Sequence, residues 1–242
     1  MESVKIKDLL SGNPYPGRGI IVGTSADGAS AMAAYFIMGR SANSRNRIFV
    51  EKPDGLYTQA YDESLVQDPS LIIYRAMAKF GCPCGNDNIV ITNGDQTDTI
   101  VELAPKGYHF EGALATRQFE PDAPNWTPRI SALLSFANGD FSYKINILKS
   151  SDDKGTSCNR FNFSYAPHAG EGHFISTYKT DGNPLPSFEG EPIKVTIPQE
   201  LGEFADEIWE SLNFDNKISL FVCKRNIKTA EIQTKIINKN CF

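Results

Sequence analysis

Paired strands joined by short turns are the feature of this sequence that most limits its fold. Three pairs of apolar runs are separated by turn sequences, and they span residues 18–24 with 31–39, 129–136 with 141–148, and 218–224 with 229–237. In the first pair, RGIIVGT and AMAAYFIMG flank SADGAS, whose Asp27-Gly28 is a strong turn signal. ANGD separates the second pair in the same way, and the third closes around Arg225-Asn226. With a further strand expected at 86–93, the pattern predicts antiparallel sheets.

Helical segments are fewer than strands. In 198–213 (PQELGEFADEIWESLN), apolar side chains from Leu201 to Leu212 recur at i, i+3, i+4, i+7, i+8 and i+11, while acidic residues fill the other face. Shorter helices are expected at 3–10, 97–104 and 110–119. Long runs of strict β-α-β alternation are absent, which argues against a doubly wound parallel sheet.

Several strands are apolar on both faces, so each sheet should be covered on both sides. The sequence therefore predicts an α+β fold of two stacked, mainly antiparallel sheets covered by helices. Residues 149–191 are rich in Gly, Ser, Asp, Asn and Pro, which predicts long loops around one strand at 173–179. Since no repeat, low-complexity tract or linker divides the chain, we expect a single domain over residues 1–242.

The charge balance narrows the range of partners. The chain has 24 Lys+Arg against 29 Asp+Glu, a formal net charge of −5, which argues against nucleic acid and anionic membranes as partners. No run approaches the roughly 18–20 apolar residues of a membrane helix, and none near the start is typical of a signal peptide. The cysteines are odd in number and scattered, which suits a reducing compartment and predicts a cytoplasmic protein; they are Cys82, Cys84, Cys158, Cys223 and Cys241.

Metal-ligating and nucleophilic signatures are weak. The sequence has no phosphate loop of the G-x-x-x-x-G-K-[ST] type, no G-x-S-x-G, no H-E-x-x-H and no C-x-x-C. Cys82-Pro83-Cys84 could contribute to a zinc site, but no second ligand pair follows at suitable spacing, which favours two buried or idle thiols. His168 and His173 have no helical or hairpin ligand spacing. We predict no metal and no cofactor.

Arginines concentrate in one segment, GRSANSRNR at 39–47. Arg40, Arg45 and Arg47 are separated only by small or polar residues such as Ser41, so guanidinium and backbone N–H groups can converge on one anion. The alternative is a solvated basic loop that pairs with surface carboxylates. In an acidic chain, such a local cluster favours a small anion over a polymer.

A second polar segment, NGDQTDT at 93–99, directly follows the strand NIVIT. Thr97 and Asp98 can cap the start of the following helix, which alone would explain the segment. Asn93, Asp95 and Thr97 can equally hydrogen-bond a ribose or a purine edge.

A third segment, FEPDAPNWTPRI at 119–130, places Glu120, Asp122 and Arg129 around a proline-rich loop before a core strand. Either carboxylate can be a solvent-exposed surface group or a catalytic group. Tyr74 in SLIIYRAM reads as a core aromatic whose hydroxyl has a partner.

Four segments in order, YPGRGIIVG, FIMGRSANSRNR, ITNGDQTDTI and WTPRISALL, give the chain a family resemblance over residues 15–135. It resembles the archaeal-type IMP cyclohydrolases, which convert formamidoimidazole-carboxamide ribotide (FAICAR) to inosine monophosphate (IMP) in purine biosynthesis. The resemblance implies the fold of N-terminal-nucleophile hydrolases, a four-layer αββα sandwich. Members lack the processed N-terminal nucleophile, and here Met1 is followed by Glu2.

The resemblance also implies a site for a small ribonucleotide. Ring closure is intramolecular, since the carboxamide nitrogen attacks the formyl carbon and water leaves, so orientation and proton transfer can carry it. Glu120 would act as the base, although the loop can also be aligned with the family so that Asp122, two residues away, takes that position. Arg47 or Tyr74 would stabilise the oxyanion. The implied substrate-binding residues are Arg18, Arg40, Ser41, Arg45, Asn93, Gly94, Asp95, Thr97, Asp98 and Arg129.

Other functions stay open at this point. An amide hydrolase on the same fold would need a nucleophile exposed by cleavage. A non-catalytic purine-nucleotide-binding relative would keep the arginines, and the 149–191 loops could redirect the enzyme to a related ribotide. A homo-oligomer is compatible with the sequence.

Overall fold

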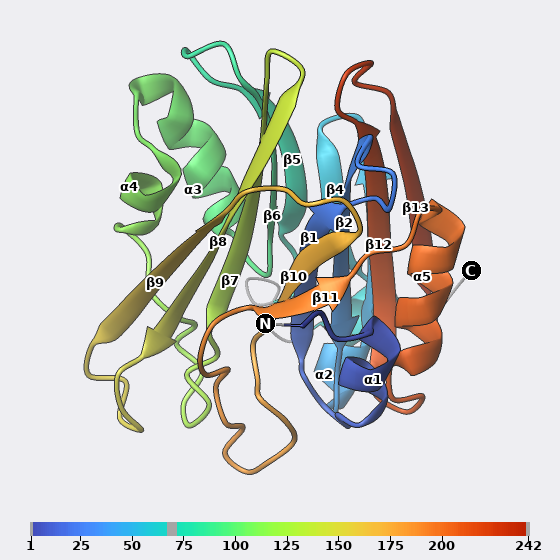
Figure 1. Cartoon of the computed structure of the whole chain (residues 1–242). Coiled ribbons are helices and arrows are strands. Elements are labelled where there is room, and N and C mark those ends of the chain that lie inside the picture. The colour runs from blue at the N-terminus through green and yellow to red at the C-terminus, as the bar shows by residue number, and fades with distance from the viewer. Residues whose placement is uncertain (1, 67–71, 241–242) are drawn as a thin grey trace.

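Two antiparallel sheets stacked face to face form the centre of the protein (Figure 1). The computed structural model describes residues 2–66 and 72–240. One sheet has six strands in the order β11 (Ile193–Thr196), β10 (Glu171–Ser176), β1 (Arg18–Thr24), β2 (Ser30–Met38), β12 (Lys217–Asn226) and β13 (Ile232–Asn238). The other has seven, in the order β3 (Arg47–Lys52), β4 (Gly55–Ala60), β5 (Arg75–Gly81), β6 (Asp87–Thr92), β7 (Arg129–Ala137), β8 (Asp140–Ser150) and β9 (Cys158–Tyr165). The predicted pair of stacked antiparallel sheets is confirmed.

Strand β2 shows why the central strands are apolar on both faces. All its residues are buried, and successive side chains enter different cores because a strand points them to opposite faces. Tyr35 and Ile37 pack between the two sheets. Phe36 and Met38 pack in a second core, under the helices.

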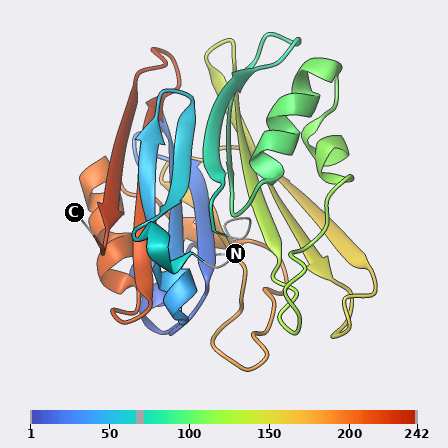
Figure 2. The ribbon, with the colours of Figure 1, turned by 180° about the vertical axis from the view of Figure 1, so that it is seen from behind.

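Helices cover the outer face of each sheet (Figures 1 and 2). α1 (Ile6–Ser11) and α5 (Leu201–Ser211) pack on the six-stranded sheet, and the apolar stripe of α5 faces that core. α3 (Gln96–Leu103) and α4 (Phe110–Leu114) pack on the seven-stranded sheet. Three short elements lie in connections: α2 (Ala42–Arg45) and the 3₁₀ turns η1 (Glu63–Leu65) and η3 (Ala104–Lys106).

Several expectations need correction. The structure contains five strands that the sequence pattern did not predict, namely β3, β4, β5, β9 and β11. β9 lies within 149–191, the segment expected to be mostly loop. The helix expected at 110–119 ends at Leu114, and the last strand begins at Ile232, so its turn follows Asn226 instead of closing around it. Thr97 and Asp98 lie inside α3, whose N-cap is Asp95.

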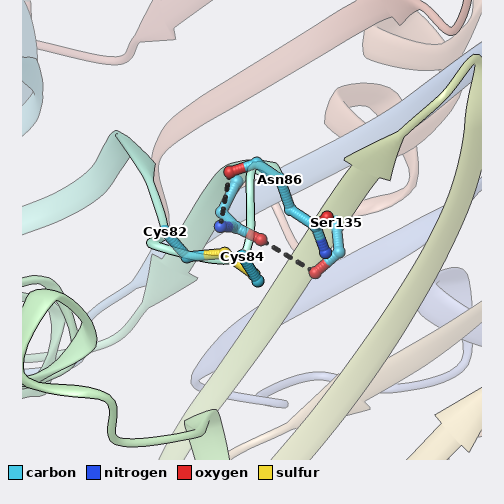
Figure 3. Close-up of a disulfide and its surroundings, with 5 residues drawn as sticks. Cys82, Cys84, Asn86 and Ser135 are labelled. Atoms are coloured by element: carbon cyan, nitrogen blue, oxygen red, sulfur yellow. Dashed lines mark hydrogen bonds between the residues drawn. A yellow bond between two sulfur atoms is a disulfide. The ribbon is translucent and has the colours of Figure 1, made fainter.

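The cysteines of the Cys-Pro-Cys segment form a disulfide in the turn between β5 and β6 (Figure 3). The prediction of two idle thiols was therefore wrong. The Cys82 backbone N–H donates to the Asn86 carbonyl at 3.0 Å, which closes the same turn. Cys158 and Cys223 are free, and Cys241 lies outside the described residues.

Within residues 2–66 and 72–240, no cluster of three His, Cys, Asp or Glu side chains is arranged to hold a metal ion. Over the same residues, every helix is too short or too polar to cross a membrane.

Candidate active site

A cavity of about 320 Å³ brings together segments that are far apart in the sequence. Its walls come from residues 15–18, 38–47, 120–127 and 178–185, with Ile72. The start of β1 and the end of β2 are paired, and they hold the first two segments side by side. The other two segments are loops, tied together where the Leu185 backbone N–H donates to Asn125 Oδ1 at 3.1 Å. One wall is therefore built on strands and the other on loops.

Arg18 and Glu120 form a buried ion pair in this cavity. Arg18 Nη2 lies 3.1 Å from Glu120 Oε2, and the two residues are 8% and 5% exposed. Burial raises the pKa of the Glu120 carboxyl, and the Arg18 guanidinium limits that rise. Burial alone would lower the pKa of Arg18, but Glu120 and nearby tyrosines leave it above its ordinary value. The pair thus holds a carboxylate with raised proton affinity at the cavity wall.

Arg47 is a buried cation with a different environment. Its residue is 4% exposed, and its Nε donates to the Ser44 carbonyl at 2.9 Å. A longer contact of 3.4 Å joins its Nη2 to the Met38 carbonyl. Among the residues that the structure describes, Arg47 forms no ion pair. A buried guanidinium without a counterion favours an anion in the cavity that it lines.

The segment between β2 and β3 wraps tightly around Gly39, which explains the glycine before the arginines. A Cβ atom at Gly39 would lie 2.6 Å from Ser44 Oγ and 2.8 Å from the Ser44 backbone. Ser41 caps α2, because its side chain accepts from the Ser44 N–H at 3.1 Å. Asn43 Oδ1 is buried at the cavity wall and has no hydrogen-bond partner among the described residues. Polar groups of this turn are therefore available to a ligand.

Arg40 lies at the exposed side of the cavity. Its guanidinium forms an ion pair with Asp181 and donates to the Gly182 carbonyl at 3.1 Å. It also covers the ring of Tyr15, 4.9 Å from the ring centre. Arg40 therefore closes the cavity against the loop after β10.

Asp122 holds the loop wall together. Its Oδ1 accepts from the Thr127 backbone N–H at 2.7 Å, and its Oδ2 accepts from the Thr127 hydroxyl. The Thr127 hydroxyl is also 2.6 Å from the Tyr178 hydroxyl, and burial raises the pKa of Tyr178 to about 12. Asp122 is therefore held within this turn, whereas Glu120 pairs with Arg18 at the cavity wall.

The sequence model of the family described as IMP cyclohydrolase-like protein matches residues 15–229. The chain belongs to this family. The match spans every segment that lines the cavity. No curated protein matches the chain. Among solved structures, Anbu from Hyphomicrobium sp. strain MC1 is similar over 93% of this chain and 88% of that one, with 10% sequence identity and a TM-score of 0.37.

In this IMP cyclohydrolase-like protein, Arg18, Arg40, Ser41, Arg47 and Glu120 line one cavity, as the sequence reasoning grouped them. Sequence reasoning missed other lining residues, which are Tyr15, Gly17, Met38, Asn43, Ser44, Ile72, Asn125, Thr127, Tyr178 and Leu185. Asn43 and Ser44 are part of the quoted arginine segment, so that motif already contained their signal. Tyr178 and Leu185 carry no local signal, since only the fold brings them to the cavity.

Tyr74 and Arg45 are placed outside the cavity lining. Tyr74 is 6% exposed, and its hydroxyl lies 2.6 Å from the Tyr35 hydroxyl in the core between the sheets. Arg45 Nε donates to the Gly39 carbonyl at 3.1 Å, and its Nη2 lies 3.4 Å from Asn216 Oδ1. Arg45 therefore stabilises the turn between β2 and β3, and Tyr74 lies in the core between the sheets and does not line the cavity.

The NGDQTD turn also lies outside the cavity. Asn93 Oδ1 accepts from the Ile130 N–H at 2.8 Å, and the Thr97 hydroxyl lies 2.8 Å from that of Thr92. Asp98 pairs with Arg75 at 2.6 Å. These contacts join β6, α3 and their neighbours.

Arg129 belongs to the same cluster. It pairs with Asp95 at 2.7 Å and donates to Gln96 Oε1 at 2.7 Å. A Cβ atom at Gly94 would lie 2.3 Å from the Arg129 guanidinium, which explains the glycine. The predicted substrate-binding residues that the structure does not place on the cavity wall are Arg45, Asn93, Gly94, Asp95, Thr97, Asp98 and Arg129.

His173 is part of an aromatic cluster away from this cavity. Its Nδ1 lies 2.7 Å from the Tyr143 hydroxyl, and its ring stacks on Tyr165 at 3.5 Å between centres. Burial, with Lys194 nearby, lowers the pKa of His173 to about 4.

Proposed function

We propose that the protein is an IMP cyclohydrolase that closes FAICAR to IMP, with loss of water, in purine biosynthesis. The observation that carries the proposal is the cavity in which Arg47, a buried cation without an ion pair among the described residues, accompanies a buried carboxylate. A ribonucleotide monophosphate supplies the anion, and an amide on the same molecule supplies the proton that a carboxylate can accept.

The phosphate end of the substrate is assigned to the segment between β2 and β3. Arg47, Arg40 and the polar groups of Ser41 and Asn43 line the same side of the cavity. A guanidinium fork can bind two phosphate oxygens at once, and a hydroxyl or amide can complete the set. The volume of about 320 Å³ is at the lower end of the range for small-molecule pockets, roughly 300–1,000 Å³.

Ring closure is assigned to Glu120 and Arg18. The Glu120 carboxylate takes a proton from the carboxamide nitrogen as that nitrogen attacks the formyl carbon. The formyl oxygen gains negative charge, which the Arg18 or Arg47 guanidinium stabilises, and it takes the proton that Glu120 received. The hydroxyl then leaves as water, as the formamido nitrogen gives up its N–H proton and forms the ring C=N bond. Holding the two groups in contact supplies several kcal/mol, up to about 7–11 in ideal intramolecular cases. A raised Glu120 pKa suits this role, since a stronger base accepts the proton more readily.

We further assign the fold to the N-terminal-nucleophile-hydrolase type, which the order helices, sheet, sheet, helices supports. A single domain, a cytoplasmic location and a homo-oligomeric state stay predictions.

The test is conversion of FAICAR by the purified protein, with IMP separated by chromatography. We expect the wild type to form IMP well above the uncatalysed rate. Glu120→Gln should lower kcat by at least about 100-fold, as loss of a general base does, and still bind IMP. Glu111→Gln is the control, because Glu111 lies on α4 outside the cavity and pairs with Lys144.

Binding of IMP without any turnover by the wild type would replace this proposal with the non-catalytic nucleotide-binding function. Equal kcat for Glu120→Gln and the Glu111→Gln control would remove Glu120 from the mechanism.

A further inference from the structure

A second cavity, of about 300 Å³, is lined by three arginines and, among the residues that the structure describes, by no carboxylate. Arg117 follows α4, Arg129 begins β7 and Arg160 lies on β9. The cavity also includes Phe119 and Pro121, which flank Glu120 in sequence. It is therefore distinct from the cavity that Glu120 lines, although both share the segment 119–121.

The charges at this second cavity do not balance. Asp95 serves both Arg117 and Arg129, and both contacts use the same oxygen, Oδ1. Arg160 donates to the carbonyls of Cys158 at 3.1 Å and Arg117 at 2.7 Å. In the part of the chain that the structure describes, Arg160 has no ion pair. Three guanidinium groups thus face one carboxylate, an excess that attracts anions.

The arginines are also held in place, as a binding site requires. The side chains of Arg129 and Arg117 are 12% and 26% exposed. Arg129 is fixed further by its hydrogen bond to Gln96, and Arg160 by the backbone of Arg117. Ordering these long side chains before binding reduces the entropy lost when a ligand binds.

We propose that Arg117, Arg129 and Arg160 form a second anion site, which takes a phosphoryl group. Planar guanidinium forks match the oxygens of phosphate better than they match a monovalent ion. Free phosphate or pyrophosphate and the phosphate of a nucleotide share this chemistry. The inference does not depend on the proposed reaction, and absence of FAICAR turnover would leave it unchanged.

The position of the site gives its ligand access to the catalytic segment. Phe119 and Pro121 line the second cavity, while Glu120 between them lines the first. A bound phosphoryl group would contact both neighbours of Glu120.

The experiment is calorimetric titration of pyrophosphate into Arg47→Met, a background that removes a cation from the first cavity. We expect one saturable site in this background. Adding Arg117→Met or Arg160→Met should weaken it at least tenfold, and Arg160→Lys should restore part of the affinity. Lys235→Met is the matched control, because Lys235 is an exposed cation paired with Asp206 at a different surface.

Two results would overturn the proposal: no saturable binding in the Arg47→Met background, or equal weakening by Lys235→Met and Arg160→Met. Thermal melting of each variant shows first that it folds, and the exposed Arg160 makes its variants the safest of the set. Parallel titrations with inorganic phosphate and IMP separate the ligand sources. Competition by IMP assigns the site to a nucleotide phosphate, and binding of phosphate and pyrophosphate alone assigns it to free anions.

Discussion

Replacing Arg47 by methionine should separate ligand binding from stability. Methionine keeps most of the length and apolar contact of the arginine stem but removes the charge. If Arg47 stabilises the fold, its replacement should lower the free energy of unfolding. If Arg47 binds a ligand, its replacement should lower the affinity for that ligand. Arg47 is 4% exposed and, within residues 2–66 and 72–240, its hydrogen bonds go to the carbonyls of Ser44 and Met38.

The magnitudes follow from these contacts. Loss of a charge-assisted hydrogen bond to phosphate costs about 1.5–3 kcal/mol, so the Kd for IMP should rise roughly 10- to 150-fold. Loss of the bond of 2.9 Å to Ser44 costs about 1 kcal/mol of unfolding free energy. Removing an uncompensated buried charge offsets that loss. The unfolding free energy without ligand should therefore stay within about 1 kcal/mol of wild type or rise.

Calorimetric titration with IMP and urea unfolding without ligand measure the two effects. Lys235→Met is the control, because Lys235 pairs with Asp206 and lies outside the cavity lining. It should leave the IMP affinity within about twofold of wild type, a change of about 0.4 kcal/mol.

An Arg47→Met variant whose unfolding free energy falls by several kcal/mol, and which still binds IMP like the wild type, would refute a ligand-binding role for Arg47. That result would make Arg47 a structural residue whose buried charge is stabilised by its two contacts with backbone carbonyls.

Three further predictions concern stability. Gly17→Ala should cost about 2–5 kcal/mol of unfolding free energy, measured in urea, because Gly17 has a φ of 77° and its added Cβ would lie 2.4 Å from the Tyr178 ring. Reduction of the Cys82–Cys84 disulfide should lower the unfolding free energy by only about 1.6 kcal/mol, since the closed loop is so short, and thiol titration follows the reduction. Acid should destabilise the protein through His173, whose folded pKa of about 4 lies below its ordinary value. Its contribution is present above about pH 6.5, is lost as pH falls toward 4, and amounts to about 1–2 kcal/mol after allowance for partial exposure.

Each has a result that would contradict it. A Gly17→Ala protein with wild-type stability would show that the segment before β1 can shift away from the ring. Global unfolding on reduction would give the disulfide a role that loop entropy does not explain. For His173, a His173→Gln variant with the same loss of stability between pH 6.5 and 4 as the wild type would assign that loss to other groups.

Local pattern predicted the strands that lie between two cores. β1, β2 and β12 are rich in apolar residues because both of their faces are buried, whereas β7 has one fully buried face and one that is only partly buried. β9 escaped prediction for the opposite reason. It is the last strand of its sheet and most of its residues are at least partly exposed, so CNRFNFSY shows too little apolar character to read as a strand.

The site was predictable to the extent that its residues are local in sequence. The arginine segment contributes Arg40 and Arg47 to the cavity, but Arg45 turns back onto Gly39 because α2 ends there. The NGDQTD turn looks like a ligand loop because its polar groups are close together. Its side chains bind one another and the strand neighbours, and only tertiary contacts such as Asp95 with Arg129 reveal this.

The two walls of the first cavity have different freedom to change. Arg18 begins β1 and Arg47 begins β3, so the cationic grip is fixed by the frames of both sheets. Glu120 and Tyr178 come from loop segments, which tolerate insertions more readily than strands do, and both side chains are buried. Under the proposed function, a descendant of this chain could keep the arginines that bind the substrate phosphate and change the residues that act on the rest of the substrate. In that case the strands carry the residues that bind the substrate, and the loops carry the residues that determine the reaction.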